Sequence, residues 1–206
     1  MFGFLVYPDL EELDLVGPWE IVSLWHAHAG GPPCITIGPS DVPVRCRHGL
    51  QIVPDVAAEE APPVDYLLVP GGEGSKAAAQ DPRMVDFLRE RAPTVTCLAS
   101  VCTGVRVLRA AGLVDGRQIT THWSALDEAR QWPEVTAVEE RHVRDGPIWT
   151  AAGISAGIDL ALDLVAAEAG DPAAAVVRRR AEYFPSPRRA DTETWDDAPG
   201  YLRREN

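Results

Sequence analysis

Residues 95–112, VTCLASVCTGVRVLRAAG, place a short apolar run directly before a segment whose apolar residues have helical spacing. The run 95–99 has the length and composition of a buried β-strand, and 105–111 those of a helix closed by Gly112. Almost no loop separates the two. Cys102 is therefore expected on a sharp strand-to-helix turn that presents its side chain at the carboxyl end of a sheet.

The rest of the chain repeats this alternation, which predicts an α/β fold with a mostly parallel sheet and helices on both faces. The expected strands are 2–7, 35–37, 42–46, 50–53, 65–70, 95–99, 119–121, 135–138, 141–143 and 148–151, and two of the three segments 35–37, 42–46 and 50–53 are candidate partners in a hairpin. The expected helices are 11–26, 84–91, 105–111, 124–131, 154–169 and 172–180. In the first of these, Gly17-Pro18 marks a start or a break, so only the part after Gly17 is expected to be regular.

Length and composition indicate one domain, 1–185, followed by a surface tail, 186–206, that is rich in Pro, Asp and Arg. The formal charge of -12 argues against nucleic acid and anionic lipid as partners. No apolar run is long enough to span a bilayer, and the N-terminus lacks the pattern of a signal peptide. Four cysteines without CxxC spacing are typical of free thiols, which favours the cytoplasm.

Backbone N–H groups at the start of the helix after Cys102 are expected to favour a thiolate and to lower the thiol pKa below its ordinary value of about 8.5. Gly71-Gly72 ends a neighbouring strand and could bring a second N–H group close, which would complete an oxyanion hole. The alternative is a packed structural cysteine, since free cysteines are often buried. The nearby glycine pair favours the reactive interpretation.

Four segments together resemble the ordered motifs of the ThiJ/PfpI superfamily: 69–72 (VPGG), 100–104 (SVCTG), 120–123 (TTHW) and 153–159 (GISAGID). Within it, 13–18 (LDLVGP), Cys102-Thr103 and 141–146 are most similar to isonitrile (isocyanide) hydratases. The resemblance implies a class I glutamine amidotransferase-like domain with a flavodoxin-like three-layer sandwich. It also implies a homodimer with the cysteine in a small pocket near the subunit interface.

By the same resemblance, Cys102, Asp14 and Thr103 are the catalytic candidates, and Gly71, Gly72, Thr103, His122 and Ile154 the oxyanion and substrate-binding ones. From the residues alone, a solvated acid at a helix start is the favoured interpretation of Asp14, and a helix cap is a common role for a residue placed as Thr103 is. A structural role for His122 is favoured over that of a catalytic base. The other histidines lack metal-ligand spacing, so no metal and no organic cofactor is expected.

The predicted activity is cysteine-dependent hydration of an isonitrile, a small-molecule substrate, to an N-substituted formamide in a lyase-type reaction. The first alternative is a glyoxalase or deglycase acting on reactive carbonyl compounds, which would depend more on His122 and a nearby glutamate. The second is a non-catalytic redox sensor oxidised at Cys102, because related domains occur in transcription regulators. The position after the cysteine is Thr103 rather than the histidine of peptidase-like relatives, which argues against proteolysis.

Overall fold

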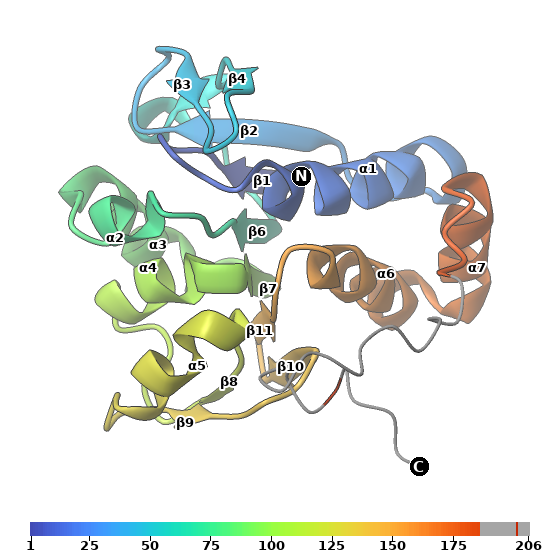
Figure 1. Cartoon of the computed structure of the whole chain (residues 1–206). Coiled ribbons are helices and arrows are strands. Elements are labelled where there is room, and N and C mark those ends of the chain that lie inside the picture. Colours follow the sequence, from blue (N-terminus) through green and yellow to red (C-terminus); the bar gives the residue numbers. More distant parts are fainter. Residues whose placement is uncertain (186–200, 202–206) are drawn as a thin grey trace.

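The computed structural model describes residues 1–185 and Tyr201, and a seven-stranded sheet forms its centre (Figure 1). The strand order is β10-β11-β7-β6-β1-β2-β5. The strands are β1 (Phe2–Leu5), β2 (Cys34–Gly38), β5 (Val56–Ala57), β6 (Tyr66–Val69), β7 (Cys97–Val101), β10 (His142–Asp145) and β11 (Ile148–Ala151). Neighbouring strands are parallel, except that β10 runs antiparallel to β11.

Helices cover both faces of this sheet, as the sequence predicts. Figure 1 shows α1, α6 and α7 together on one side and α2 to α5 on the other. Their bounds are α1 (Glu12–Ala29), α2 (Ser75–Ala78), α3 (Pro82–Arg91), α4 (Val105–Ala110), α5 (Trp123–Arg130), α6 (Ala156–Ala169) and α7 (Asp171–Arg180), with 3₁₀ turns η1 (Ala58–Glu60) and η2 (Cys102–Gly104). The result is a flavodoxin-like three-layer sandwich, in which β1, β7 and β11 are buried along their whole length.

Two small ribbons lie outside the main sheet. β3 (Val44–Arg45) and β4 (Gln51–Ile52) pair antiparallel, so 42–46 and 50–53 are the two of the three candidate segments that form the predicted hairpin. β8 (Gln118–Ile119) and β9 (Thr136–Ala137) pair in parallel. The sequence did not predict β5 or α2, because both are too short to show a period.

Helix α1 differs from the prediction, because it begins at Glu12 and continues through Pro18 without a break. The reason is its packing against α6. A Cβ on Gly17 would lie 2.9 Å from the Ile158 side chain, and one on Gly157 would lie 2.9 Å from that of Pro18. Close contact between the two helices therefore compensates for the hydrogen bond that a proline removes.

The predicted tail, 186–206, lies outside the described residues apart from Tyr201, so its boundary stays a prediction. Within the described part of the chain, no helix has both the length and the apolar character needed to cross a membrane.

The order of the strands decides which loops meet. β11, β7, β6 and β1 are consecutive in the sheet, and all four run in the same direction. Their carboxyl ends therefore share one edge, and the segments that follow them contain Ile154, Cys102, Gly71-Gly72 and Asp14 in turn. The fold thus gathers the residues that the sequence singled out.

Candidate active site

Cys102 lies directly after β7, at the first position of η2, and its backbone is strained. Its φ of 57° is in the left-handed region, which non-glycine residues rarely occupy. Two hydrogen bonds hold this conformation: Cys102 N donates to Ala152 O at 2.8 Å, and the Thr121 hydroxyl donates to Cys102 O at 2.8 Å. The sharp turn predicted from the sequence is present, and the surrounding structure stabilises it.

Gly71 and Gly72 lie against this turn so closely that neither position can carry a side chain. A Cβ on Gly71 would lie 2.5 Å from Thr103 N and 2.8 Å from Cys102 Cβ. Gly72 has a φ of 103°, and a Cβ there would lie 2.4 Å from Glu11 N. Glycine is required here for both contact and conformation.

The two glycine N–H groups point to different partners. Gly71 N donates to Asp14 Oδ2 at 2.9 Å, so it orients the carboxyl group rather than the sulfur. Gly72 N donates to the Thr103 hydroxyl at 3.1 Å and, like Thr103 N, lies close enough to Cys102 to lower the pKa of its thiol. The N–H groups that face the sulfur therefore belong to Gly72 and Thr103.

Asp14 is fully buried in the first turn of α1, which excludes the solvated acid that the sequence left open. Burial raises its pKa to about 8; the Gly71 N–H opposes the shift, the Glu11 charge adds to it, and hydrogen bonding to Cys102 opposes it. Its Oδ1 atom is buried and has no hydrogen-bond partner among the described residues. At neutral pH this carboxyl group is therefore mostly protonated and can donate a proton.

The prediction that the pKa of Cys102 falls below its ordinary value is wrong. Burial raises the pKa of this thiol to about 12, and the Asp14 charge adds to the shift. Hydrogen bonds from Thr103 and Gly72 lower it, but they do not outweigh burial of a side chain that is only 7% exposed. The thiol and the carboxyl group thus form a protonated pair in the free protein.

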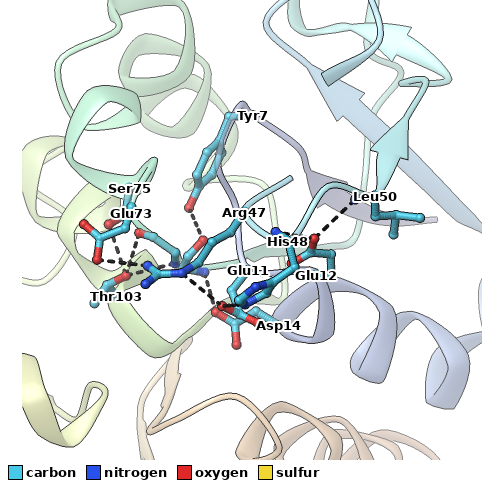
Figure 2. Close-up of polar contacts among 12 residues, drawn as sticks. Tyr7, Glu11, Glu12, Asp14, Arg47, His48, Leu50, Glu73, Ser75 and Thr103 are labelled. Atoms are coloured by element: carbon cyan, nitrogen blue, oxygen red, sulfur yellow. Dashed lines mark hydrogen bonds and ion pairs between the residues drawn. The ribbon is translucent and has the colours of Figure 1, made fainter. Parts of the chain in front are cut away.

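Thr103 is more than a helix cap. Its buried hydroxyl accepts hydrogen bonds from Gly72 N and the Ser75 hydroxyl, each at 3.1 Å, and lies 3.1 Å from Gly72 O, to which it can donate. Figure 2 shows this cluster beside the charged residues of the site. The threonine therefore connects the helix after the cysteine to the glycine turn.

His122 is the N-cap residue of α5. Its Nδ1 atom accepts a hydrogen bond from Ser124 N at 3.3 Å and lies 2.8 Å from the Ser124 hydroxyl. Its ring covers Gly153, where a Cβ would lie 2.7 Å from His122 Cδ2. Burial lowers its pKa, so the imidazole is neutral at neutral pH. These contacts agree with a supporting role in the pocket.

A pocket of about 290 Å³ opens over the sulfur. It brings together predicted site residues, namely Gly72, Cys102, Thr103, His122 and Ile154. Gly71 and Asp14 lie behind this surface, in contact with Cys102. The pocket wall also contains six residues that the sequence analysis missed: Glu11, Arg47, His48, Glu73, Arg106 and Ser124.

Apart from Ser124, the missed residues form a charged rim. Arg47 pairs with Glu73 at 2.9 Å, and His48 lies 3.4 Å from Glu11 (Figure 2). Arg47 and His48 come from the β3–β4 hairpin, far from Cys102 in the sequence, and no local pattern marks them. Tyr7 was missed for the same reason, although its buried hydroxyl donates to Pro70 O and lies 3.3 Å from Gly71 O.

One group of side chains at this rim has the composition of a metal site. Ligand atoms of Glu11, Glu12 and His48 lie within 4.8 Å of one another. Existing contacts already use two of the carboxylate oxygens, because Glu12 Oε1 accepts from His48 N at 2.7 Å and Glu11 Oε2 faces His48 Nε2. These atoms are therefore held in place by the protein itself.

The structure is thus that of an α/β protein with a buried thiol on a strained strand-to-helix turn, beside a protonated carboxyl group and a glycine pair. The chain belongs to the DJ-1/PfpI family, whose sequence profile matches residues 3–167.

The relatives of the chain have different functions. An isonitrile hydratase from Pseudomonas putida is 38% identical over 197 residues, covering 96% of this chain and 84% of the relative. The HTH-type transcriptional regulator CdhR from Pseudomonas aeruginosa is 32% identical over 80% of this chain, which spans only 49% of that protein. The glutathione-independent glyoxalase DJR-1.2 from Caenorhabditis elegans is 26% identical, covering 76% of this chain and 82% of the relative.

Among solved structures, a ThiJ/PfpI family protein from Pseudomonas syringae superposes with a TM-score of 0.86 at 33% identity. The match covers 98% of this chain and 82% of that protein. The comparisons therefore support the fold and family that the sequence motifs predicted.

Proposed function

We propose that the protein hydrates an isonitrile to an N-substituted formamide, with Cys102 as nucleophile and Asp14 as proton donor. One observation carries this proposal: a thiol and a protonated carboxyl group, both buried, lie together behind a small pocket. The similarity to an isonitrile hydratase over 96% of the chain supports the same substrate class.

The first step adds the thiol across the terminal carbon of the isonitrile. Asp14 delivers its proton to that carbon while the sulfur of Cys102 forms a bond to it, and the thiol proton passes to the Asp14 carboxylate. The product is a thioimidate, in which the carbon carries one hydrogen, the sulfur and a double bond to nitrogen. The raised pKa values of Cys102 and Asp14 suit this route, because both groups begin protonated and the sulfur becomes charged only as its proton moves to Asp14.

The second step is hydrolysis. Water adds across the carbon–nitrogen double bond of the thioimidate, so that its oxygen bonds to the carbon and one of its hydrogens to the nitrogen. The resulting tetrahedral adduct then expels the sulfur. The remaining water proton returns to sulfur, which regenerates the thiol and releases the formamide. The N–H groups of Gly72 and Thr103 stabilise negative charge on sulfur as it forms and leaves.

His122 and Ile154 complete the pocket wall in this proposal, and Gly71 orients Asp14. We further propose that the protein acts as a cytoplasmic homodimer. The four cysteines have no disulfide partner, which agrees with a reducing compartment. Leu13 and Val16, exposed on α1 beside Asp14, supply apolar surface for a second copy.

The decisive experiment compares turnover of cyclohexyl isocyanide with turnover of methylglyoxal, following the formamide and the carbonyl compound separately. Wild type should form the formamide, and Cys102→Ser and Asp14→Asn should lose this activity. Full hydratase activity in both variants would contradict the mechanism.

A glyoxalase activity is the second candidate, favoured by one observation. Glu11 lines the pocket with Cys102 and His122, which supplies the glutamate that such chemistry would use. Turnover of methylglyoxal without turnover of any isonitrile would identify it, and Glu11→Gln should then abolish the activity while leaving the fold intact.

A redox sensor receives less support, because sensor thiols combine a low pKa with access to solvent. The Cys102 thiol has a raised pKa and is 7% exposed. Rapid conversion of Cys102 to sulfinic acid by dilute peroxide, detected by mass spectrometry, would reverse this judgement.

A further inference from the structure

Ser75 is a buried polar residue at the site that the proposed chemistry does not use. It begins α2 and is fully inaccessible to solvent. Its hydroxyl donates to Thr103 Oγ1 at 3.1 Å, and Arg106 Nη1 donates to Ser75 Oγ at 3.3 Å. Ser75 therefore lies between a permanent cation and the threonine beside Cys102, as Figure 2 shows for Ser75 and Thr103.

Arg106, Ser75 and Thr103 form a chain of hydrogen bonds, and the direction of each bond follows from Arg106, its first member. A guanidinium group has only donors, so the Ser75 oxygen accepts from Arg106 and its own hydrogen points to Thr103. The Thr103 oxygen accepts from Ser75 and from Gly72 N, which uses both of its lone pairs. The Thr103 hydrogen must then be donated onward.

Two acceptors compete for that hydrogen. Thr103 Oγ1 lies 3.1 Å from Gly72 O, and the same hydroxyl is near enough to the Cys102 sulfur to lower the pKa of the thiol. A neutral thiol attracts the hydrogen weakly, whereas a sulfur that carries negative charge attracts it strongly. The hydroxyl can therefore turn from the carbonyl to the sulfur as charge develops.

We propose that Ser75 is a positioning residue that holds the Thr103 hydroxyl as a hydrogen-bond donor to the Cys102 sulfur and transmits the polarity of Arg106 to it. Hydrogen bonds in such a chain polarise one another, so the donor strength of the last member depends on the first. The inference deepens the proposed function, because it concerns the sulfur on which that function rests.

Arg106, the first member of this hydrogen-bond chain, is itself fixed by its neighbours. Arg106 is mostly buried, and its Nε and Nη2 atoms pair with Glu128 on α5, with Nε 3.1 Å from Oε1. The other titratable and charged groups around Cys102 are Tyr7, Glu11, Asp14, Arg47, His48, Glu73 and His122. Ser75→Ala leaves all of these in place and removes one hydroxyl group.

The test measures the sulfur directly, without a substrate. The rate at which iodoacetamide alkylates Cys102 is followed by mass spectrometry of the peptide that contains it, across the alkaline range. Ser75→Ala should lower this rate roughly threefold to tenfold at a given pH, corresponding to a rise of about half a unit to one unit in the thiol pKa. Ser75→Thr, which keeps the hydroxyl, should restore most of the rate.

A double-mutant cycle separates positioning from a general structural effect. If Ser75 acts through Thr103, Ser75→Ala should have no further effect on alkylation in a Thr103→Val background. Ser23→Ala is the matched control, because Ser23 faces Cys34 at 3.7 Å, and it should leave Cys102 unchanged. Thermal unfolding of each variant confirms that the fold is retained.

An alkylation rate within twofold of wild type in Ser75→Ala would overturn the inference, and so would an equal loss in the Thr103→Val background. Failure of the proposed function has a different signature. If the protein hydrates no isonitrile but Ser75→Ala still slows alkylation through Thr103, the positioning role stands and the substrate assignment is wrong.

Discussion

Cys97 and Cys102 stand at opposite ends of the same stretch of chain, and their burial is nearly the same. Cys97 is 2% exposed and Cys102 is 7% exposed, and burial raises the pKa of both thiols to about 12. Burial and pKa alone therefore do not distinguish a reactive cysteine from a packed one.

Their surroundings differ. The next contributions to the pKa of Cys97 come from the charges of Glu168 and Arg144, whereas Cys102 has the Asp14 carboxyl group and the N–H groups of Gly72 and Thr103. Cys97 opens β7, and Cys102 follows its carboxyl end, where the pocket lies. In the proposed function, Cys102 rather than Cys97 is the reactive cysteine because of the sheet edge at which it lies and the hydrogen-bond donors gathered there.

The largest expected effect separates the two thiols directly. Cys102→Ser should lower hydratase activity by on the order of 10³-fold or more, because the nucleophile is lost. Cys97→Ser should keep the activity and cost about 1 kcal/mol of stability, since it buries a hydroxyl group in an apolar strand. Turnover and chemical unfolding of both variants check this. Equal losses of activity would remove the distinction between the two cysteines.

Asp14→Asn should lower activity about 10²-fold or more, because the amide keeps the shape of the carboxyl group but cannot donate its proton in the same way. In wild type, activity should fall as the pH rises through about 8, where Asp14 loses its proton. The pH profile of kcat measures this. Asp163→Asn, which alters an acid on α6 paired with His142, is the control and should leave the profile unchanged.

Gly71→Ala should reduce activity about tenfold to 100-fold and destabilise the fold by about 1–3 kcal/mol, because the new methyl group would overlap Thr103 N and Cys102 Cβ. The matched control is Gly112→Ala, where a Cβ meets nothing within 4 Å and only the left-handed backbone opposes the change. The control should lose stability and keep its activity per folded molecule. Retained activity in Gly71→Ala would show that the glycine turn is not part of the site.

The last prediction concerns the pH dependence of stability and leaves activity aside. The pKa of Asp14 is raised in the folded protein, so folding favours its protonated form, and this contribution is lost as the pH rises from about 4 to about 8. Wild type should therefore lose on the order of a few kcal/mol of stability across that range, and Asp14→Asn should show a flatter dependence. Denaturant unfolding at several pH values measures both. Parallel curves would indicate that Asp14 ionises in the folded state as easily as in the unfolded chain.

Much of the site could be predicted because its main residues follow strands. The segment 95–112 contains the strand, the turn and the helix in one local pattern. Gly71-Gly72, directly after another predicted strand, is a second such pattern. The sequence could not predict three of the pocket residues, Arg47, His48 and Arg106. The first two reach the pocket because the β3–β4 hairpin folds over it, and the third because of the direction in which its side chain leaves α4. The same limitation explains Ser75, which begins a helix too short to recognise.

Prediction failed where packing opposed a local preference. Pro18 predicted a break in the first helix, but contact between α1 and α6 carries the helix through it. The pKa of Cys102 is raised rather than lowered because burial of the sulfur and the charge of Asp14 outweigh the main-chain N–H groups, and neither effect is visible in the local sequence.

The sequence by itself determined the alternation of strands and helices, the turn that bears Cys102 and the family to which the chain belongs. Each of these depends on residues close together in the chain or on ordered motifs. Only the tertiary structure decided the ionisation of Cys102 and Asp14, the charged rim and the hydrogen-bond chain through Ser75. The physical reason is that burial and electrostatic interaction depend on distance in space, and the fold brings together groups that are far apart in sequence.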